Sequence, residues 1–273
     1  MLLTDFHIHS ICSPDGYHTI SEMAGAERDA GMRCICFTDH CDLDNSRTGE
    51  YNPGYLGKWD EINAQYKAAV AAYPDMDIRL GFELGAANHN PEQAKIVAAL
   101  PGLDFIIGSL HNLKGIADFY YLQYESIEHC QRLQEEYLDE CLEIAALDCI
   151  DVLGHLGYAR RYMLRMGLDA PVTMAQHGDK LDTIFKKLIE NGRGVEVNCS
   201  GFRTPQITDA FPSRELLRRY RELGGEIVTV GSDAHKLSQA GENIPAGLQS
   251  LHDAGFRYFT IFKDRKPEFI PIN

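Results

Sequence analysis

The sequence lacks several features that would each place it in a specialised class of protein. Its eight cysteines are scattered and form no CxxC pair, which argues against a zinc ribbon or a thioredoxin-like motif. No apolar run approaches the roughly 20 residues of a membrane-spanning helix, and no charged segment followed by a long apolar stretch opens the chain. No linker rich in proline or serine interrupts it. We therefore expect a cytoplasmic protein with free thiols and a single domain over residues 1–273.

Positive charge is also scarce. The chain has 26 Lys and Arg residues against 40 Asp and Glu residues, which gives a formal net charge of −14. Phosphate contacts along a nucleic acid need clustered basic side chains, so we expect neither a nucleic-acid partner nor a membrane partner. A small anionic substrate is compatible with this charge, because bound cations can reverse the local field.

Strand-like and helix-like segments alternate through the whole chain. Apolar runs typical of strands span residues 2–7, 34–38, 77–83, 105–108, 150–153, 194–198, 227–230 and 257–261. Helical patterns lie between them, at residues 19–30, 56–72, 91–100, 125–146, 174–191 and 213–223. Thr19 with Glu22 predicts a capping box at the start of the first helix, and Gly31 predicts its end. The alternation predicts parallel strands joined by right-handed crossovers, and seven or eight such units favour a closed α/β barrel.

Side chains that can bind metal recur at the ends of the predicted strands. His7 and His9 point to the same side of the first strand, because strand side chains alternate between faces. Alone, such a pair is weak support for a metal site. The other strand ends complete a set of nine: His7, His9, Asp15, His40, Glu83, His111, His155, Asp233 and His235. The carboxyl ends of barrel strands meet at one face of the barrel, where catalytic residues gather.

The number and type of these side chains indicate a centre with more than one metal. Nine ligands exceed the needs of one ion, so we predict two or three divalent ions with a carboxylate such as Glu83 as a bridge. Mixed imidazole and carboxylate ligands suit zinc, manganese or iron. Three of the remaining histidines are interpreted as surface or capping residues: His129, His177 and His252. His18 and His89 lie in loops near the predicted site, where a contact with substrate is an alternative to the favoured structural role.

Arginines on the later loops are candidates for phosphate binding. Arg160 and Arg161 follow His155 closely, and Arg203 follows the sixth predicted strand. A planar guanidinium holds phosphate through two hydrogen bonds, and we favour Arg160 and Arg203 over Arg161 for this contact. Three aromatic residues after the fourth strand either stack on the organic part of a substrate or anchor their loop: Phe119, Tyr120 and Tyr121.

With these motifs in view, the chain resembles the polymerase and histidinol phosphatase (PHP) superfamily from Asp5 to its end. The resemblance implies a distorted (β/α)7 barrel of mainly parallel strands with a trinuclear metal centre. Some members of the superfamily have a histidine where this chain has Asp15. The implied ligands of the first ion are His7, His9, Glu83 and Asp233, those of the second are Glu83, His111 and His155, and those of the third are Asp15, His40 and His235.

Within the superfamily, the length of the chain and its segment Glu196–Arg203 resemble the stand-alone histidinol-phosphate phosphatases. The resemblance implies hydrolysis of L-histidinol phosphate to L-histidinol and phosphate, a step of histidine biosynthesis, with Arg160, Arg203 and Ser200 as substrate contacts.

The reaction expected from these residues is metal-assisted hydrolysis of a phosphomonoester. Metal ions lower the pKa of a bridging water from 15.7 to about 7, and the resulting hydroxide attacks phosphorus in line with the leaving alkoxide. Asp233, His235 or a metal-bound water protonates the alkoxide. Asp39, which lies beside His40, is a candidate to orient a metal ligand.

Two alternatives have different consequences. The first is an enzyme of the same superfamily that acts on another small phosphate ester, a nucleotide or a phosphodiester. The second is a metal-dependent binding module without activity, which the complete set of ligands argues against.

Overall fold

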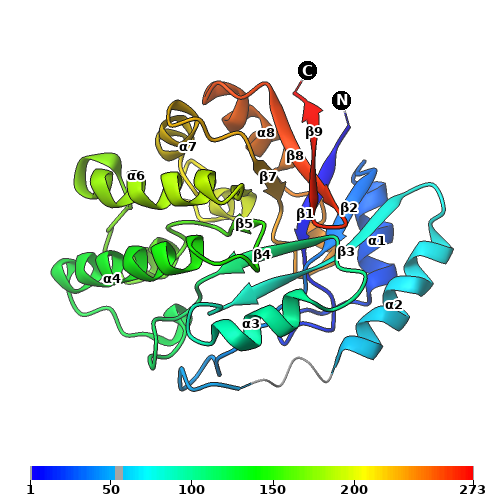
Figure 1. The fold of residues 1–273 in the computed structure, drawn as a ribbon, viewed down its shortest axis with the longest axis horizontal. Coiled ribbons are helices and arrows are strands. Elements are labelled where there is room, and N and C mark those ends of the chain that lie inside the picture. The colour runs from blue at the N-terminus through cyan, green and yellow to red at the C-terminus, as the bar shows by residue number, and fades with distance from the viewer. Residues whose placement is uncertain (1, 53–57, 273) are drawn as a thin grey trace.

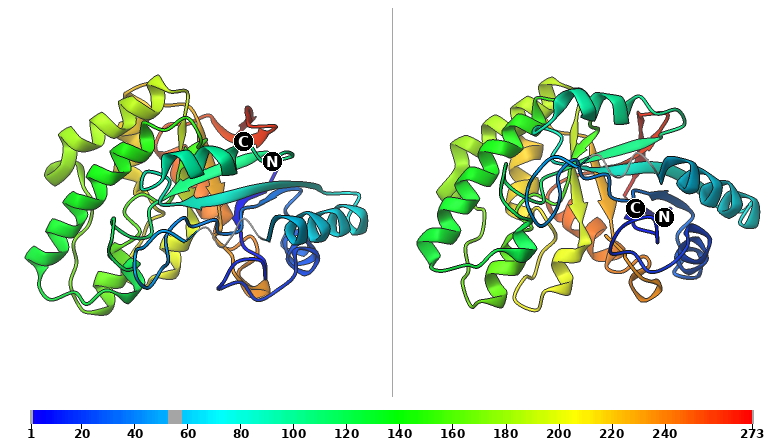
Figure 2. Two further views of the ribbon diagram at one scale, coloured as in Figure 1. Left: turned by 60° about the horizontal axis from the view of Figure 1, so that its bottom comes forward. Right: turned by 90° about the horizontal axis from the view of Figure 1, so that it is seen from below.

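The computed structural model describes residues 2–52 and 58–272. Seven parallel strands in the order β1 to β7 form one sheet that curls into a nearly closed barrel (Figures 1 and 2). The strands are β1 (Thr4–Ile8), β2 (Cys34–Phe37), β3 (Asp77–Gly85), β4 (Phe105–Ser109), β5 (Val152–Leu153), β6 (Gly194–Asn198) and β7 (Val228–Gly231). This arrangement confirms the predicted (β/α)7 barrel.

Helices cover the outside of the sheet, with α4 beside α6 on one flank and α1 beside α2 on the other (Figure 1). They are α1 (Ile20–Asp29), α2 (Trp59–Ala72), α3 (Pro91–Ala98), α4 (Ile127–Ala145), α5 (Arg160–Arg165), α6 (Met174–Glu190), α7 (Arg214–Glu222) and α8 (Ile244–Asp253). The predicted capping box is present, because Thr19 accepts from the backbone of Glu22 and Glu22 accepts from that of Thr19. The predicted start of the second helix, Leu56, lies outside the described residues. Within the described ranges, no helix is both long and apolar enough to cross a membrane.

The barrel closes where β1 meets the residues that follow β7. A single parallel bridge joins Ile8 to Ala234, and the backbone nitrogen of Asp233 donates to the carbonyl of His7 over 2.8 Å. Gly231 permits this approach, since a Cβ atom there would lie 2.3 Å from the Cβ atom of His7. The seam therefore places the two ends of the sheet, and the polar residues they carry, side by side.

The eighth predicted strand is not part of the barrel. It is β8 (Tyr258–Lys263), which pairs antiparallel with β9 (Lys266–Pro271) in a separate sheet of two strands. The hairpin contacts the amino ends of the barrel strands: Arg79 donates to the carbonyl of Phe262 over 2.6 Å, and the backbone nitrogen of Val228 donates to Thr260 Oγ1 over 3.2 Å. The hairpin therefore covers the amino end of the barrel, and the predicted ligands lie at the opposite, carboxyl end.

Candidate metal centre

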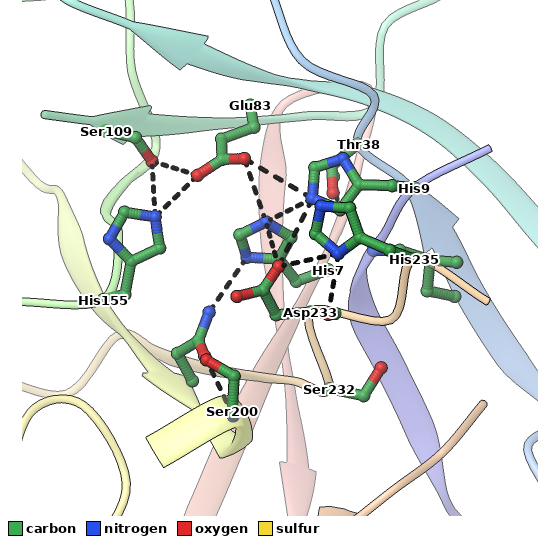
Figure 3. A network of polar contacts seen from close by, with 12 residues as sticks. His7, His9, Thr38, Glu83, Ser109, His155, Ser200, Ser232, Asp233 and His235 are labelled. Carbon is green, nitrogen blue, oxygen red and sulfur yellow. Dashed lines mark hydrogen bonds and ion pairs between the residues drawn. The ribbon is translucent and has the colours of Figure 1, made fainter. Parts of the chain in front are cut away.

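Four of the predicted ligands converge at the seam of the barrel. His7 Nε2 lies 3.0 Å from His9 Nε2 and 3.2 Å from Glu83 Oε2. Asp233 Oδ1 lies 3.5 Å from His9 Nε2 and 3.8 Å from His7 Nε2 (Figure 3). Four donors around one zinc ion, each about 2.0 Å from it, lie roughly 3.3 Å apart in a tetrahedron. The spacing of these four atoms therefore fits a single bound ion.

Glu83 lies between two groups of histidines, with one carboxylate oxygen toward each. Its Oε2 atom faces the seam and also lies 3.0 Å from His40 Nδ1. Its Oε1 atom lies 2.9 Å from His111 Nε2 and 2.6 Å from His155 Nε2, and Ser109 donates to it over 2.7 Å. A carboxylate whose two oxygens face separate sets of nitrogen donors has the geometry of a bridging ligand.

The remaining predicted ligands form a third group near the surface. Asp15 Oδ2 lies 3.2 Å from His235 Nε2, and Asp15 Oδ1 lies 3.6 Å from His40 Nε2. The imidazole of His235 stacks on that of His9, with the ring centres 4.1 Å apart. The structure therefore brings all nine predicted side chains together, in three adjoining groups.

Two carboxylates that we did not predict as site residues orient the histidine rings. Glu196 Oε1 lies 2.5 Å from His7 Nδ1, and Asp42 Oδ1 lies 2.8 Å from His111 Nδ1. An ionised carboxylate only accepts hydrogen bonds, so each ring carries its proton on Nδ1 and directs the Nε2 lone pair at the centre. A sequence signal for Glu196 exists, because it is a charged residue within the apolar strand β6. Asp42 has room only because Gly85 lacks a Cβ atom, which would lie 1.7 Å from Asp42 Oδ1.

Asp39 has a position that agrees with its predicted role of orienting a ligand side chain. Its carboxylate accepts from Ser13 Oγ over 2.7 Å and from the backbone nitrogen of Ser10 over 2.6 Å. Since the single hydroxyl proton of Ser13 goes to Asp39, the 3.1 Å contact between Ser13 Oγ and His9 Nδ1 has the histidine as its donor. Asp39 therefore orients His9 through Ser13. The same Ser13 hydroxyl accepts a hydrogen bond from the backbone nitrogen of His40.

The carboxylates of the centre have the protonation state that metal binding requires, but three histidines do not have it in the metal-free protein. Burial would lower the pKa values of His40 and His111, but carboxylates beside them raise both above 6.5, that of His111 to about 10. Burial raises the pKa values of Glu83 and Asp233, but neighbouring histidines outweigh it and hold both values well below the usual range. Burial, together with adjacent histidines, lowers the pKa of His9 well below its usual value. Burial would lower the pKa of His7 too, but the surrounding carboxylates raise it well above 6.5. The centre thus holds a concentration of buried negative charge that a cation would balance, and the donor set fits divalent metal ions.

The loop after β7 is held in a strained conformation that presents Asp233. Asp233 has a φ of 59°, in the left-handed region that aspartate tolerates better than most residues. Arg203 donates to the carbonyl of Ser232 over 2.9 Å and to that of Asp233 over 2.7 Å, so it braces this loop. Its predicted contact with phosphate stays a prediction. Ser200, also predicted to touch substrate, hydrogen-bonds within its own turn, and its position does not support that role.

A cavity of about 470 Å³ opens above the centre, and Arg161 rather than Arg160 lines it. Arg161 Nη2 lies 3.7 Å from Asp233 Oδ2. Arg160 makes two hydrogen bonds to Asp169, of 2.6 and 2.9 Å, so its position does not support the predicted phosphate contact. Consecutive residues of a helix point about 100° apart, so Arg160 and Arg161 face in different directions. The lining of the cavity therefore favours Arg161 over Arg160 for a phosphate contact, the reverse of the predicted order, and both assignments stay predictions.

The three aromatic residues after β4 have different positions. Phe119 is fully buried and anchors the loop, whereas Tyr120 and Tyr121 are largely exposed and line the mouth of the cavity. Among the other histidines, His89 has a structural role, with contacts of 2.6 Å to Asp44 and 2.5 Å to Glu140.

Comparison with known proteins identifies the family. A family model described as the PHP domain matches residues 5–200. The chain belongs to the PHP domain family. Among solved structures, the histidinol phosphate phosphatase of Lactococcus lactis, in complex with zinc, L-histidinol and phosphate, is 26% identical with a TM-score of 0.79. The similarity covers 97% of this chain and 98% of that one.

Curated relatives of this PHP domain protein have matching names. A histidinol-phosphatase of Lactococcus lactis is 26% identical, with 96% of this chain and 95% of the relative covered. A protein of Deinococcus radiodurans named probable histidinol-phosphatase is 29% identical, with 97% and 98% covered. These relatives therefore match the chain over almost its whole length.

Proposed function

We propose that this chain is a metal-dependent phosphomonoesterase that hydrolyses L-histidinol phosphate to L-histidinol and phosphate in cytoplasmic histidine biosynthesis. The supporting observation is the convergence of nine ligand side chains around Glu83 below a cavity of about 470 Å³. The substrate is proposed from the complex of the similar Lactococcus lactis enzyme. The cavity has the size of a small-molecule site.

The proposal includes two or three divalent ions, zinc, manganese or iron, shared among the three groups of ligands. When bound, such ions supply positive charge for the phosphoryl oxygens and lower the pKa of water toward 7. The residues of the chain supply the arrangement: Glu196 and Asp42 fix two histidine tautomers, and Ser13 fixes that of His9.

Arg161 and Asp233 have the positions needed for phosphate binding and proton transfer. The Arg161 guanidinium is held among the rings of Tyr158, Tyr162 and Phe211, at 5.0 to 5.7 Å from their centres, and lines the cavity. It would bind a phosphoryl oxygen through charge-assisted hydrogen bonds. Asp233 Oδ1 faces His7 and His9, whereas Oδ2 faces Arg161, so Oδ2 is the atom that would accept a proton from the attacking water and donate it to the leaving alkoxide.

A substrate screen with a ligand variant tests this function. Purified protein is assayed against L-histidinol phosphate, a mononucleotide and bis(p-nitrophenyl) phosphate, and we expect the highest kcat/KM for the first. Glu83→Gln should lower kcat by at least roughly a hundredfold and reduce the metal content per chain. The exposed control His252→Gln should match the unaltered protein. Preference for the nucleotide would reassign the substrate, and full activity of metal-free protein would contradict the mechanism.

A further inference from the structure

A buried histidine outside the set of metal ligands lies between two carboxylates. His89 Nδ1 is 2.6 Å from Asp44 Oδ2, and His89 Nε2 is 2.5 Å from Glu140 Oε2. Burial would lower the pKa of His89, but these two hydrogen bonds raise it to about 9, so the imidazole is protonated at neutral pH. Both nitrogens of an imidazolium are donors, and each of them here faces an acceptor. His89 is therefore a cation that links the segment after β2, which carries Asp44, to helix α4, which carries Glu140.

Asp44 belongs to the same short segment as Asp42, the residue that orients the proposed ligand His111. The segment runs beside β3, because the backbone nitrogens of Cys41 and Leu43 donate to carbonyls of that strand over 2.7 and 3.1 Å. Residues two apart in an extended segment project to the same side. Cys41 and Leu43 are buried in the core, so the side chains of Asp42 and Asp44 project to the other side, next to each other.

Two consecutive residues after β4 contact these two aspartates. His111 Nδ1 lies 2.8 Å from Asp42 Oδ1, and Asn112 Nδ2 donates to Asp44 Oδ2 over 3.2 Å. The oxygen of Asp44 that accepts from Asn112 is also the one that faces His89. His89 thus holds the Asp44 carboxylate in the position from which it contacts the residue next to the ligand.

The second carboxylate beside His89 contacts the same loop. The backbone nitrogen of Lys114 donates to Glu140 Oε1 over 3.0 Å, while Oε2 faces His89. The side chain of Asp44 is 4% exposed and that of Glu140 is 18% exposed. Among the described residues, neither forms an ion pair with a lysine or an arginine. Without the imidazolium, two largely buried carboxylates would lose their cationic partner, which favours movement of both toward solvent.

We propose that His89 is a positioning residue of the metal centre, which holds Asp44 and, through the segment Cys41–Asp44, keeps Asp42 hydrogen-bonded to His111. The inference rests on the metal-dependent function proposed above and deepens it, because it names a residue that controls one ion without touching it. Its consequence is confined to the ion proposed for Glu83, His111 and His155. The ring of His111 would lose the fixed partner that keeps its proton on Nδ1 and its Nε2 lone pair directed at that ion.

Three variants of the holoenzyme test this chain of contacts: His89→Gln, Asp44→Asn and the double variant. Metal affinity is measured by titration with a competing chelator, and the absorption spectrum of the Co²⁺-loaded protein reports the coordination geometry. Circular dichroism checks that each variant is folded. The matched control is His177→Gln, which alters another buried histidine, between α6 and α4, whose Nε2 atom lies 3.5 Å from Glu135 Oε1.

We expect His89→Gln and Asp44→Asn each to weaken the binding of one ion per chain by roughly three- to tenfold, and to change the Co²⁺ spectrum. The loss should be smaller than the roughly 10- to 100-fold typical when the direct partner of a ligand is altered. The double variant should bind metal no worse than the weaker single variant, because both changes break the same contact. His177→Gln should keep the affinity and the spectrum. If His89→Gln does not fold, Asp44→Asn decides the inference by the same two measurements.

The inference and the proposed function fail by different results. Unaltered metal affinity and an unaltered spectrum in folded His89→Gln protein would overturn the inference, and so would independent, additive losses in the double variant. An equal loss of affinity in His177→Gln would also overturn it, because the cause would then be a general loss of stability. None of these results bears on the substrate. Weaker metal binding by His89→Gln in an enzyme that does not hydrolyse L-histidinol phosphate would support the inference and contradict the proposed function.

Discussion

Replacement of Glu196 by glutamine tests whether residues outside the ligand set control the metal centre. Glu196 is almost fully buried, and Asn198 Nδ2 lies 3.3 Å from both of its oxygens, each of which also has a shorter contact with another N–H donor. His7 Nδ1 lies 2.5 Å from Oε1, and the backbone nitrogen of His155 donates to Oε2 over 2.8 Å. A glutamine side chain has one oxygen and one NH2 group, so it can accept from only one of these donors.

Either orientation of the glutamine has a cost. If its NH2 group faces His7, the ring must move its proton to Nε2 and loses the lone pair directed at the centre. If its NH2 group faces the backbone nitrogen of His155, two donors oppose each other and about 1–3 kcal/mol of hydrogen bonding is lost in the loop that carries His155. Changes in the partners of metal-binding histidines typically cost roughly 10- to 100-fold in metal affinity or activity, which corresponds to about 1.4 to 2.7 kcal/mol. We expect Glu196→Gln to fall in this range.

The assay is a titration with a competing chelator, read as metal bound per chain, together with kcat/KM. Circular dichroism checks that the variant is folded. The control Glu190→Gln alters an exposed carboxylate at the end of α6 and should leave both quantities unchanged. A folded Glu196→Gln protein with unaltered metal affinity would refute the reasoning, because His7 would then bind metal without its hydrogen-bond partner.

Three further predictions follow from the positions of other residues. Arg161→Met should lower kcat/KM by roughly a hundredfold, whereas Arg160→Met should change it little, and steady-state kinetics of the two variants would reveal a wrong assignment by the opposite order. Removal of metal with a chelator should abolish activity and lower the Tm in differential scanning calorimetry, and added Mn²⁺ or Zn²⁺ should restore both; an unchanged Tm would count against ions at the barrel seam. Burial would lower the pKa of His89, but its hydrogen bonds to Asp44 and Glu140 raise it from 6.5 to about 9. The stabilisation, on the order of 2 kcal/mol, should be complete below pH 6.5 and lost as the pH rises through about 9, so denaturant unfolding of His89→Gln should converge with that of the unaltered protein at high pH.

The parts of the fold that the sequence predicted are those governed by local pattern. Seven buried strands and the intervening helices produce apolar runs and periodicities that can be recognised without tertiary information. The β8–β9 hairpin was not predicted, because the sequence of its turn, Asp264–Arg265, lacks the glycine that usually marks such a turn. Both residues nevertheless have positive φ, 49° and 60°. A strand-like segment at the end of an α/β pattern is then counted as one more barrel strand, although its partner strand lies directly after it.

The convergence of the nine proposed ligand side chains could be predicted, but the directions of the residues around them could not, for a geometric reason. A ligand such as His155 sits at the end of a strand, and the barrel brings all strand ends to one face regardless of side-chain detail. Arg160 and Arg161 are adjacent in a short helix, and their directions depend on where α5 begins and how it is rotated against the cavity. Ser200 and Arg203 lie in a 3-10 turn after β6, where the same uncertainty applies. Side-chain direction in loops and short helices is therefore the information that the sequence pattern does not carry.

Because the centre lies at the seam of the barrel, bound metal ions would stabilise the fold as well as take part in the chemistry. β1 and β7 are joined by a single bridge and a few backbone hydrogen bonds, fewer than in the β3–β4 and β6–β7 ladders. His7 and His9 come from one side of this seam and Asp233 from the other, and their donor atoms lie within 3.8 Å of one another. In the absence of a cation, the buried carboxylates of Asp233 and Glu83 lie beside this junction, and protonated histidines must balance them. Bound ions would replace those protons and cross-link the two edges of the sheet, so loss of metal should open the barrel first where β1 meets β7.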